Sequence, residues 1–140
     1  MGITYAEMLL MNSKVASPKP KRKLNDREHQ IQCACVKWFR LQYPKMAKLL
    51  IAPPNGGARN PVEGAKKKAE GMTSGVADLV LFKSNRFYGT LCIEMKTKTG
   101  RQSESQKEWQ KLVEANGHKY VVCRSLDDFI REVKEYLKYT

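Results

Sequence analysis

The chain has few of the residues that build zinc sites, disulfide frameworks or membrane spans. It contains four cysteines without a C-x-x-C pair and two isolated histidines: Cys33, Cys35, Cys92, Cys123, His29 and His118. This spacing indicates neither a zinc site nor a secreted disulfide framework. No apolar run approaches the length of a membrane span, and the first residues lack the basic start of a signal peptide. We therefore expect a soluble, intracellular protein with reduced cysteines packed in its interior and no membrane partner.

Acidic residues are also scarce. The 140 residues include 26 Lys and Arg against 14 Asp and Glu, a formal net charge of +12, which favours a polyanionic partner. Residues 1–24 hold five basic residues and one acid, so most of the excess lies elsewhere. The run 18–23 (PKPKRK) predicts a flexible basic arm, which could serve solubility or contact nucleic acid. We divide the chain into this arm, residues 1–24, and one domain, residues 25–140.

The domain has enough sequence to bury a core, and its periodicity predicts a regular order of elements: α, β, small α, β, β, α, β, α. Cap and breaker residues set the bounds. Helices are expected over 25–43, 60–70, 103–116 and 125–137, with N-caps at Asn25, Asn60, Ser103 and Ser125. Strands are expected over 48–52, 79–82, 91–96 and 119–123, with a hairpin turn at 84–89. Trp38 and Trp109 lie on apolar stripes, which favours core positions over base stacking.

The most specific chemistry lies at Asp78 and in the strand-like run 90–96 (TLCIEMK). Glu94 and Lys96 are two positions apart, so in a strand both point to one face while the apolar residues beside them point to the other. Two acids and a lysine on one surface suit hydrolysis of a phosphodiester. The carboxylates can hold a divalent cation that activates water, and the lysine can neutralise charge on the phosphate. Taken alone, the pattern also fits a solvated strand face.

Together with the order of elements, four motifs make the chain resemble the PD-(D/E)XK nuclease core, and more narrowly the VRR-NUC domain, the virus-type replication-repair nuclease module. The motifs are Asn55-Gly56-Gly57-x-Arg59, Gly71-x3-Gly75-x2-Asp78-Leu79, Ile93-Glu94-x-Lys96, and Ser103-x2-Gln106 followed by Trp109. The resemblance covers about residues 28–125. It implies an α/β fold with a central mixed β-sheet flanked by helices. Ala77 departs from the family's usual Pro, and Met95 from its usual aliphatic residue.

The resemblance also implies a site. Mg²⁺ or Mn²⁺ would be held by Glu28, Asp78, Glu94 and the backbone carbonyl of Met95, while Asp78, Glu94, Lys96 and Gln106 would form the catalytic group. Each of three residues has a structural alternative. Glu28 and Gln106 fit the third helical position of capping boxes, and Asp78 fits a turn. Glu28 also falls on the buried face of its helix, where a carboxylate needs a partner.

Contacts to the DNA backbone are expected from seven residues: Asn55, Arg59, Lys66, Lys67, Lys68, Lys98 and Arg101. The resemblance implies a metal-dependent, structure-selective DNA endonuclease acting on branched DNA such as four-way (Holliday) junctions. Similarity to stand-alone, phage-type members implies a homodimer and, for a phage-encoded protein, the cytoplasm of a bacterial host. The alternative from another class is a nonenzymatic, basic DNA-binding module with a degenerate nuclease fold.

Overall fold

The computed structural model describes residues 2, 4–7, 23–54 and 60–140, and within the first long helix it describes side chains from Asp26 onward. Most of the predicted basic arm lies outside the described residues. So do the predicted DNA contacts Asn55 and Arg59.

The described elements follow the predicted order. They are α2 (Lys23–Gln42), the 3₁₀ helix η1 (Pro44–Leu49), β1 (Leu50–Ile51), α3 (Pro61–Ala69), β2 (Leu79–Leu81), β3 (Leu91–Met95), α4 (Glu104–Ala115), β4 (Lys119–Cys123) and α5 (Leu126–Leu137). Three of the four predicted N-caps are confirmed. Asn60, Ser103 and Ser125 each accept a hydrogen bond from the backbone N–H three residues on, which starts α3, α4 and α5.

The four strands form one mixed sheet in the order β1-β2-β3-β4. β1 with β2 and β2 with β3 are antiparallel, whereas β3 and β4 are parallel. Leu79 of β2 lies opposite Ile93 of β3, so the residue before Leu79 meets the residue after Ile93. This register brings Asp78 and Glu94 to the same end of the sheet.

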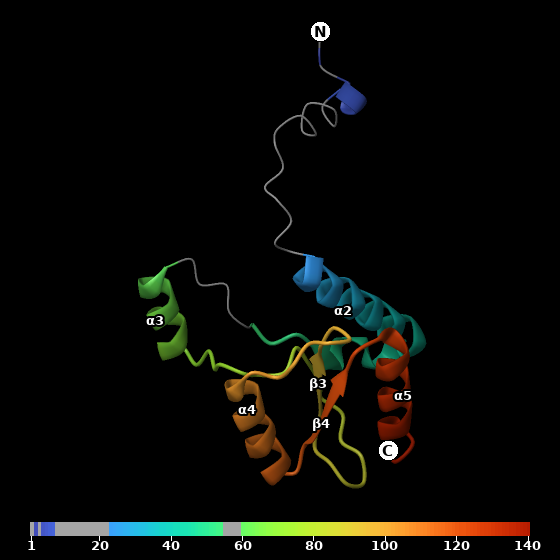
Figure 1. The fold of residues 1–140 in the computed structure, drawn as a ribbon. Coiled ribbons are helices and arrows are strands. Elements are labelled where there is room, and N and C mark those ends of the chain that lie inside the picture. Colours follow the sequence, from blue (N-terminus) through green and yellow to red (C-terminus); the bar gives the residue numbers. More distant parts are fainter. Residues whose placement is uncertain (1, 3, 8–22, 55–59) are drawn as a thin grey trace.

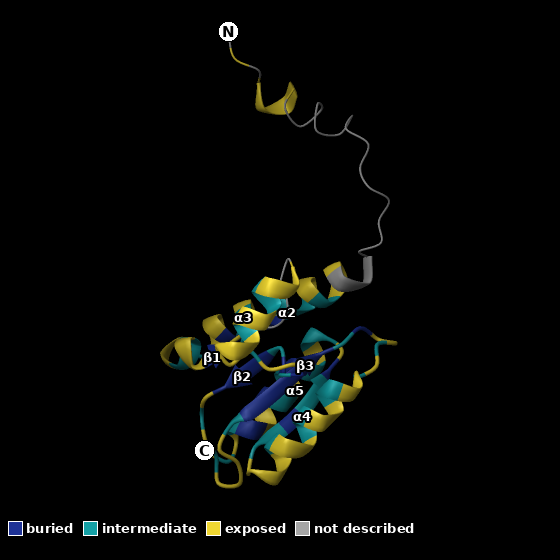
Figure 2. Cartoon of the chain, turned by 90° about the vertical axis from the view of Figure 1, so that its left-hand side faces the viewer, coloured by how far each residue is buried: buried dark blue, intermediate teal, exposed yellow. Residues whose placement is uncertain are grey.

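Helices cover both faces of the sheet (Figure 1), with α4 on one side of β3 and β4 and α5 on the other. Leu91, Ile93 and Met95 face the main core with side chains of α2 and α5, such as Phe39 and Phe129. The intervening β3 residues turn to α4, where a smaller core forms from Ala77, Val80, Cys92 and Tyr120 against Trp109 and Val113. Figure 2 shows the buried strands beneath the exposed outer surface of α4. The predicted alternation along β3 is therefore confirmed.

Two predictions about the first half of the domain are wrong. α2 begins at Lys23, so Asn25 lies inside the helix and not at the predicted N-cap position. The predicted strand 48–52 is reduced to Leu50–Ile51, because Pro44 starts a 3₁₀ helix that includes residues 44–49.

The prediction that all four cysteines pack in the interior is wrong for Cys33, which is exposed. The other three cysteines are buried as expected.

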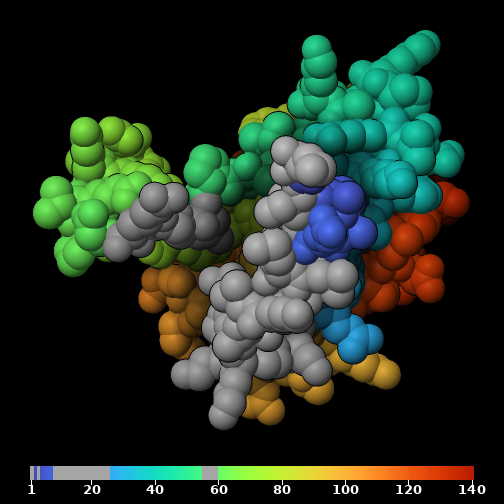
Figure 3. Space-filling view, turned by 90° about the horizontal axis from the view of Figure 1, so that it is seen from above, coloured from blue at the N-terminus to red at the C-terminus, as the bar shows by residue number. Residues whose placement is uncertain are grey.

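α3 has no buried residue and projects from one side of the molecule (Figure 3). It carries Lys66, Lys67 and Lys68 in its last turn, and Lys67 pairs with Glu63 at 3.5 Å. Among the described helices, none combines the length and apolarity that a membrane span requires.

Candidate active site

Asp78 is fixed to the neighbouring strand by its own side chain. Its Oδ2 atom accepts a hydrogen bond of 2.7 Å from the backbone N–H of Met95. A carboxylate that accepts a backbone N–H is held in one orientation. Asp78 is thus more than a turn residue, because it joins the start of β2 to the end of β3 beside Glu94.

Glu94 is the buried acid of the site, with only 1% of its surface exposed. Its Oε1 atom accepts a hydrogen bond of 3.0 Å from Nε2 of Gln106 and lies 3.9 Å from Nζ of Lys96. Its Oε2 atom accepts a hydrogen bond of 3.3 Å from the hydroxyl of Tyr120. The structure therefore brings Glu94, Lys96 and Gln106 together, as the sequence predicted.

Burial first, and then the hydrogen bond and charge of the neighbouring Asp78 carboxyl, raise the pKa of Glu94 from 4.5 to about 8, although Lys96 and Tyr120 oppose the rise. Both causes of the rise penalise the charged form of the side chain. A divalent cation between the two carboxyls would offset both, because it supplies positive charge where solvent is excluded. The donor chemistry of this pair therefore fits a hard cation such as Mg²⁺ or Mn²⁺.

Gln106 caps α4 and also contacts Glu94. Its Oε1 atom accepts the N–H of Ser103 at 2.8 Å, and its backbone N–H donates to Oγ of Ser103 at 3.3 Å, which completes a capping box. The other end of the same amide donates to Glu94. The cap thus fixes which end of the amide faces the site.

Gly75 sets the approach of the Asp78 segment to α4. Its φ angle is +81°, and a Cβ atom at this position would lie 2.2 Å from the carbonyl oxygen of Ser105. Only glycine fits such a close approach in the left-handed region. The chain therefore passes directly over the first turn of α4, next to Gln106, before it reaches Asp78.

Glu28 reaches the end of β3 from α2. Its Oε1 atom accepts a hydrogen bond of 3.4 Å from the backbone N–H of Thr97, the residue after Lys96. This tertiary contact takes the place of the predicted capping interaction. Across the described part of the chain, no group of three or more His, Cys, Asp or Glu side chains is placed to hold a metal ion. Asp78 and Glu94 thus form an adjacent pair, and Glu28 contacts the chain at Thr97, just after Lys96.

Two supporting contacts escaped the sequence analysis. Tyr120 binds Glu94, and Nε2 of Gln102 donates to the Tyr120 hydroxyl at 3.1 Å. The role of Tyr120 could have been predicted from strand alternation. Tyr120 lies opposite Cys92, which is two positions before Glu94, so Tyr120 and Glu94 point to the same face of the sheet. Arg124 had no such signal. Its Nη1 atom donates to the carbonyl oxygens of Thr97 and Gly100, both at 2.7 Å, and so ties down the loop that follows β3.

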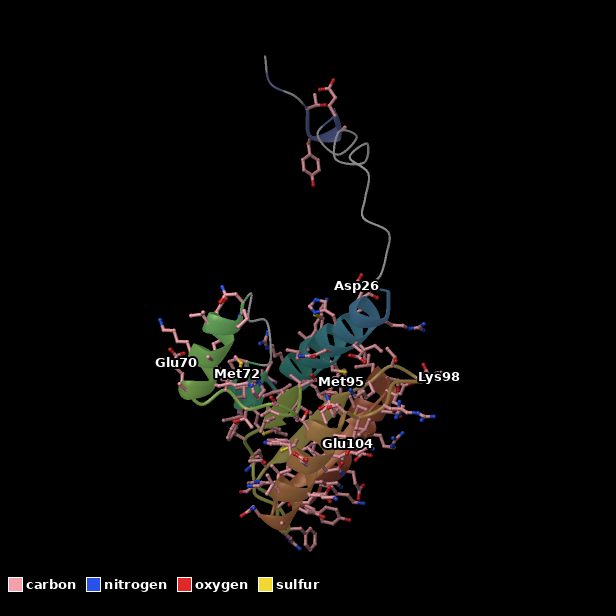
Figure 4. All side chains as sticks on the ribbon, turned by 60° about the vertical axis from the view of Figure 1, so that its left-hand side comes forward. Asp26, Glu70, Met72, Met95, Lys98 and Glu104 are labelled. Carbon is pink, nitrogen blue, oxygen red and sulfur yellow. The ribbon has the colours of Figure 1, made fainter. Side chains whose placement is uncertain are left out.

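The predicted DNA contacts within the described residues lie on two segments, the loop after β3 and the helix α3. Lys98 and Arg101 are exposed on the loop after β3, and Lys66 and Lys68 are exposed on α3. In Figure 4, Met95 lies between Lys98 on one side and Glu70, at the end of α3, on the other. A cleft of about 800 Å³ adjoins the loop, and its lining includes Lys98, Arg27 and Arg124.

The mixed sheet with flanking helices forms a PD-(D/E)XK-like core, the core of a nuclease-type domain, and Asp78, Glu94 and Lys96 lie together at one end of this sheet. The sequence model of the VRR-NUC domain matches residues 16–127, and the chain belongs to this family. A solved structure described as a VRR_NUC domain protein resembles it with a TM-score of 0.71 and 25% sequence identity, over 81% of this chain and 89% of that one. A search of curated proteins finds no match.

Proposed function

We propose that the protein is a metal-dependent DNA endonuclease. The observation that carries this proposal is the buried Glu94 carboxyl beside Asp78, with Lys96 and Gln106 directed at it. Two adjacent carboxyls with excluded solvent are costly unless a cation joins them. The family assignment makes phosphodiester hydrolysis the chemistry that such a group would serve.

Asp78, Glu94 and the carbonyl of Met95 would hold Mg²⁺ or Mn²⁺, and Glu28 would complete the donor set from α2. When bound, such a cation acts as a Lewis acid toward the phosphate and lowers the pKa of water. The protein itself orients the donors. The N–H of Met95 holds Asp78, and Gln106 and Tyr120 hold the two oxygens of Glu94.

Lys96 would stabilise the negative charge that develops on the phosphate. Its ammonium lies on the same strand face as Glu94, 3.9 Å from Oε1, which supports this role. Loss of an electrostatic group of this kind typically costs about 10²-fold or more in rate.

The lysines and arginines around the site would hold the phosphate backbone of DNA without reading sequence. Lys98 and Arg101 flank the site on one side, and Lys66, Lys67 and Lys68 lie on α3. We extend the proposal to branched DNA, with a homodimer presenting two sites to a four-way junction. The net charge of +12 supports a large polyanionic substrate.

A panel of labelled substrates tests this selectivity: a four-way junction, a flap, a single strand and a linear duplex, each with Mg²⁺, Mn²⁺ or EDTA. We expect metal-dependent cutting with the highest kcat/KM on the junction, and a dimer by sedimentation. Equal rates on junction and linear duplex would contradict branch selectivity. A nonenzymatic binding module would instead bind these DNAs equally with and without metal and cut none of them.

A further inference from the structure

The end of the sheet opposite the active site carries exposed aromatic rings surrounded by basic side chains. Phe87, in the loop between β2 and β3, is 66% exposed, and Tyr88 follows it with 36% exposed. Tyr139, after α5, packs edge-on against Phe87 with ring centroids 5.4 Å apart. We call these three residues the aromatic patch. Figure 1 shows this loop and the C-terminus at the lower end of the molecule, away from the C-terminal ends of β3 and β4.

The loop that presents Phe87 is held firmly. Asn85 accepts the N–H groups of Phe87 and Tyr88 at 2.9 and 2.8 Å, and its amide donates to the carbonyl of Tyr136 at 3.0 Å. The N–H of Arg86 donates to the carbonyl of Tyr139 at 2.9 Å. The rings therefore stand on a fixed backbone, and a partner would not have to order the loop on binding.

Cations frame the aromatic patch. Lys119 Nζ lies 5.8 Å from the centroid of Tyr88, and Lys138 Nζ lies 5.8 Å from that of Tyr139. Arg86, whose N–H is bonded to Tyr139, is exposed, and Glu135 lines the hollow of about 300 Å³ next to Phe87, Tyr88 and Tyr139. Positive charge therefore predominates around the rings. A second copy of the chain would bring the same cations face to face, whereas a polyanion would complement them.

We propose that the aromatic patch binds unpaired nucleic acid, with bases stacked on Phe87 and Tyr139 and phosphates next to Lys119 and Lys138. Exposed rings combined with a basic surface are the features by which proteins hold single strands without sequence preference. The inference rests on the proposed function for the identity of the ligand as DNA, but it does not depend on cleavage. From Thr90 to Lys96 an extended strand spans roughly 20 Å, so one DNA substrate can reach both surfaces.

Fluorescence anisotropy in EDTA tests this binding without cutting, with a labelled oligo(dT) of about 12 nucleotides and a duplex of equal length. We expect Phe87→Ala to weaken oligo(dT) binding by roughly 5- to 100-fold and duplex binding by less than about twofold. Leu112→Ala is the matched control, since Leu112 is 62% exposed on α4, and it should change neither affinity. Lys138→Gln removes one cation and keeps the aromatic rings. Because one phosphate contact is lost, the slope of log K for oligo(dT) binding against log salt concentration should fall in magnitude by about 0.7.

Equal losses on the two probes, or no loss on oligo(dT), would overturn the inference while leaving the proposed nuclease intact. So would a dimer that Phe87→Ala converts to monomer with oligo(dT) affinity unchanged, because the patch would then join two copies of the chain. Failure of the unmodified protein to bind either probe would overturn the DNA assignment itself, and the inference with it.

Discussion

Glu94 is a carboxyl that its surroundings stabilise poorly as an anion. Two hydrogen bonds and the ammonium of Lys96 favour its charge, but burial and Asp78 outweigh them and raise its pKa to about 8. Such a residue lowers the stability of the empty protein at high pH and gains most from a bound cation. The free-energy cost of a buried carboxyl at such a site is compensated elsewhere in the fold, here by the two hydrophobic cores on either side of β3.

The raised pKa of Glu94 predicts how stability depends on pH without metal. The folded state holds its proton up to about pH 8, whereas the unfolded chain releases it near 4.5, so this stabilising contribution is complete below about pH 4.5 and is lost as pH rises through 8. In EDTA, the Tm should therefore fall from pH 5 to pH 9 more steeply for the unmodified protein than for Glu94→Gln. Glu104→Gln, on the exposed first turn of α4, is the control. Parallel Tm profiles for the unmodified protein and Glu94→Gln would contradict the burial argument.

Gly75 permits a second prediction at the residue scale. Gly75→Ala should destabilise the fold by about 2 kcal/mol or more beyond the roughly 1–2 kcal/mol of left-handed strain, because its Cβ would meet the backbone of Ser105. Gly117→Ala is closely matched, since its φ angle is +84° and a Cβ there meets nothing within 4 Å. Urea unfolding compares the two variants. Equal losses of stability would show that the contact with α4 imposes no constraint.

Among the elements, the loop after β3 is held by two side chains from distant parts of the chain. Arg124 donates to two carbonyls of this loop at 2.7 Å, and Glu28 accepts the N–H of Thr97. The loop follows Lys96 directly, so its position governs where the lysine ammonium lies. A guanidinium carries five N–H donors on a long side chain, whereas the amide of Gln carries two on a shorter one.

We therefore expect Arg124→Gln to lower the free energy of unfolding by about 1–2 kcal/mol and to reduce kcat more than it raises KM. Arg131→Gln is the control, because the ion pairs of Arg131 with Asp128 and Glu132 lie within α5. Urea unfolding and steady-state cleavage kinetics measure both variants. An Arg124→Gln enzyme with unchanged kcat would mean that the loop does not position the site.

The elements that sequence predicted well are those whose signals are local. Ser103 and Ser125 cap helices by contacts within four residues, and the strand over 119–123 has the predicted bounds. The failures arise where distant contacts decide. The role of Glu28 depends on a hydrogen bond with Thr97, 69 residues away, and the contacts of Tyr120 with Glu94 and of Arg124 with Thr97 join residues 26 and 27 positions apart.

At the scale of the whole molecule, two proposed functional surfaces lie at opposite ends of the sheet. The C-terminal end of β3 gathers Asp78, Glu94 and Lys96, and the opposite end carries the aromatic patch of Phe87, Tyr88 and Tyr139. α3 stands apart with its lysines (Figure 3). Because the chain has a net charge of +12, a polyanion such as DNA is attracted to all of these surfaces, and the affinity for DNA should depend strongly on salt concentration.

Replacing Lys66, Lys67 and Lys68 together by Gln should reduce the slope of log K against log salt for duplex DNA by up to about 2.7, if each lysine neutralises one phosphate. The change should weaken binding similarly for unrelated sequences. Lys107→Gln combined with Lys111→Gln, on the exposed surface of α4, is the control. A slope that the α3 variant leaves unchanged would place the DNA path elsewhere.

Cleavage of labelled DNA by the unmodified protein, Asp78→Ala and Lys96→Ala tests the central claim most directly. With Mg²⁺ or Mn²⁺ we predict cutting that EDTA abolishes, that Asp78→Ala removes, and that Lys96→Ala slows by about 10²-fold or more, while Lys107→Ala leaves it unchanged. Tight DNA binding without cutting in any metal, or equal cutting by all the variants, would contradict the assignment of this site as a nuclease centre.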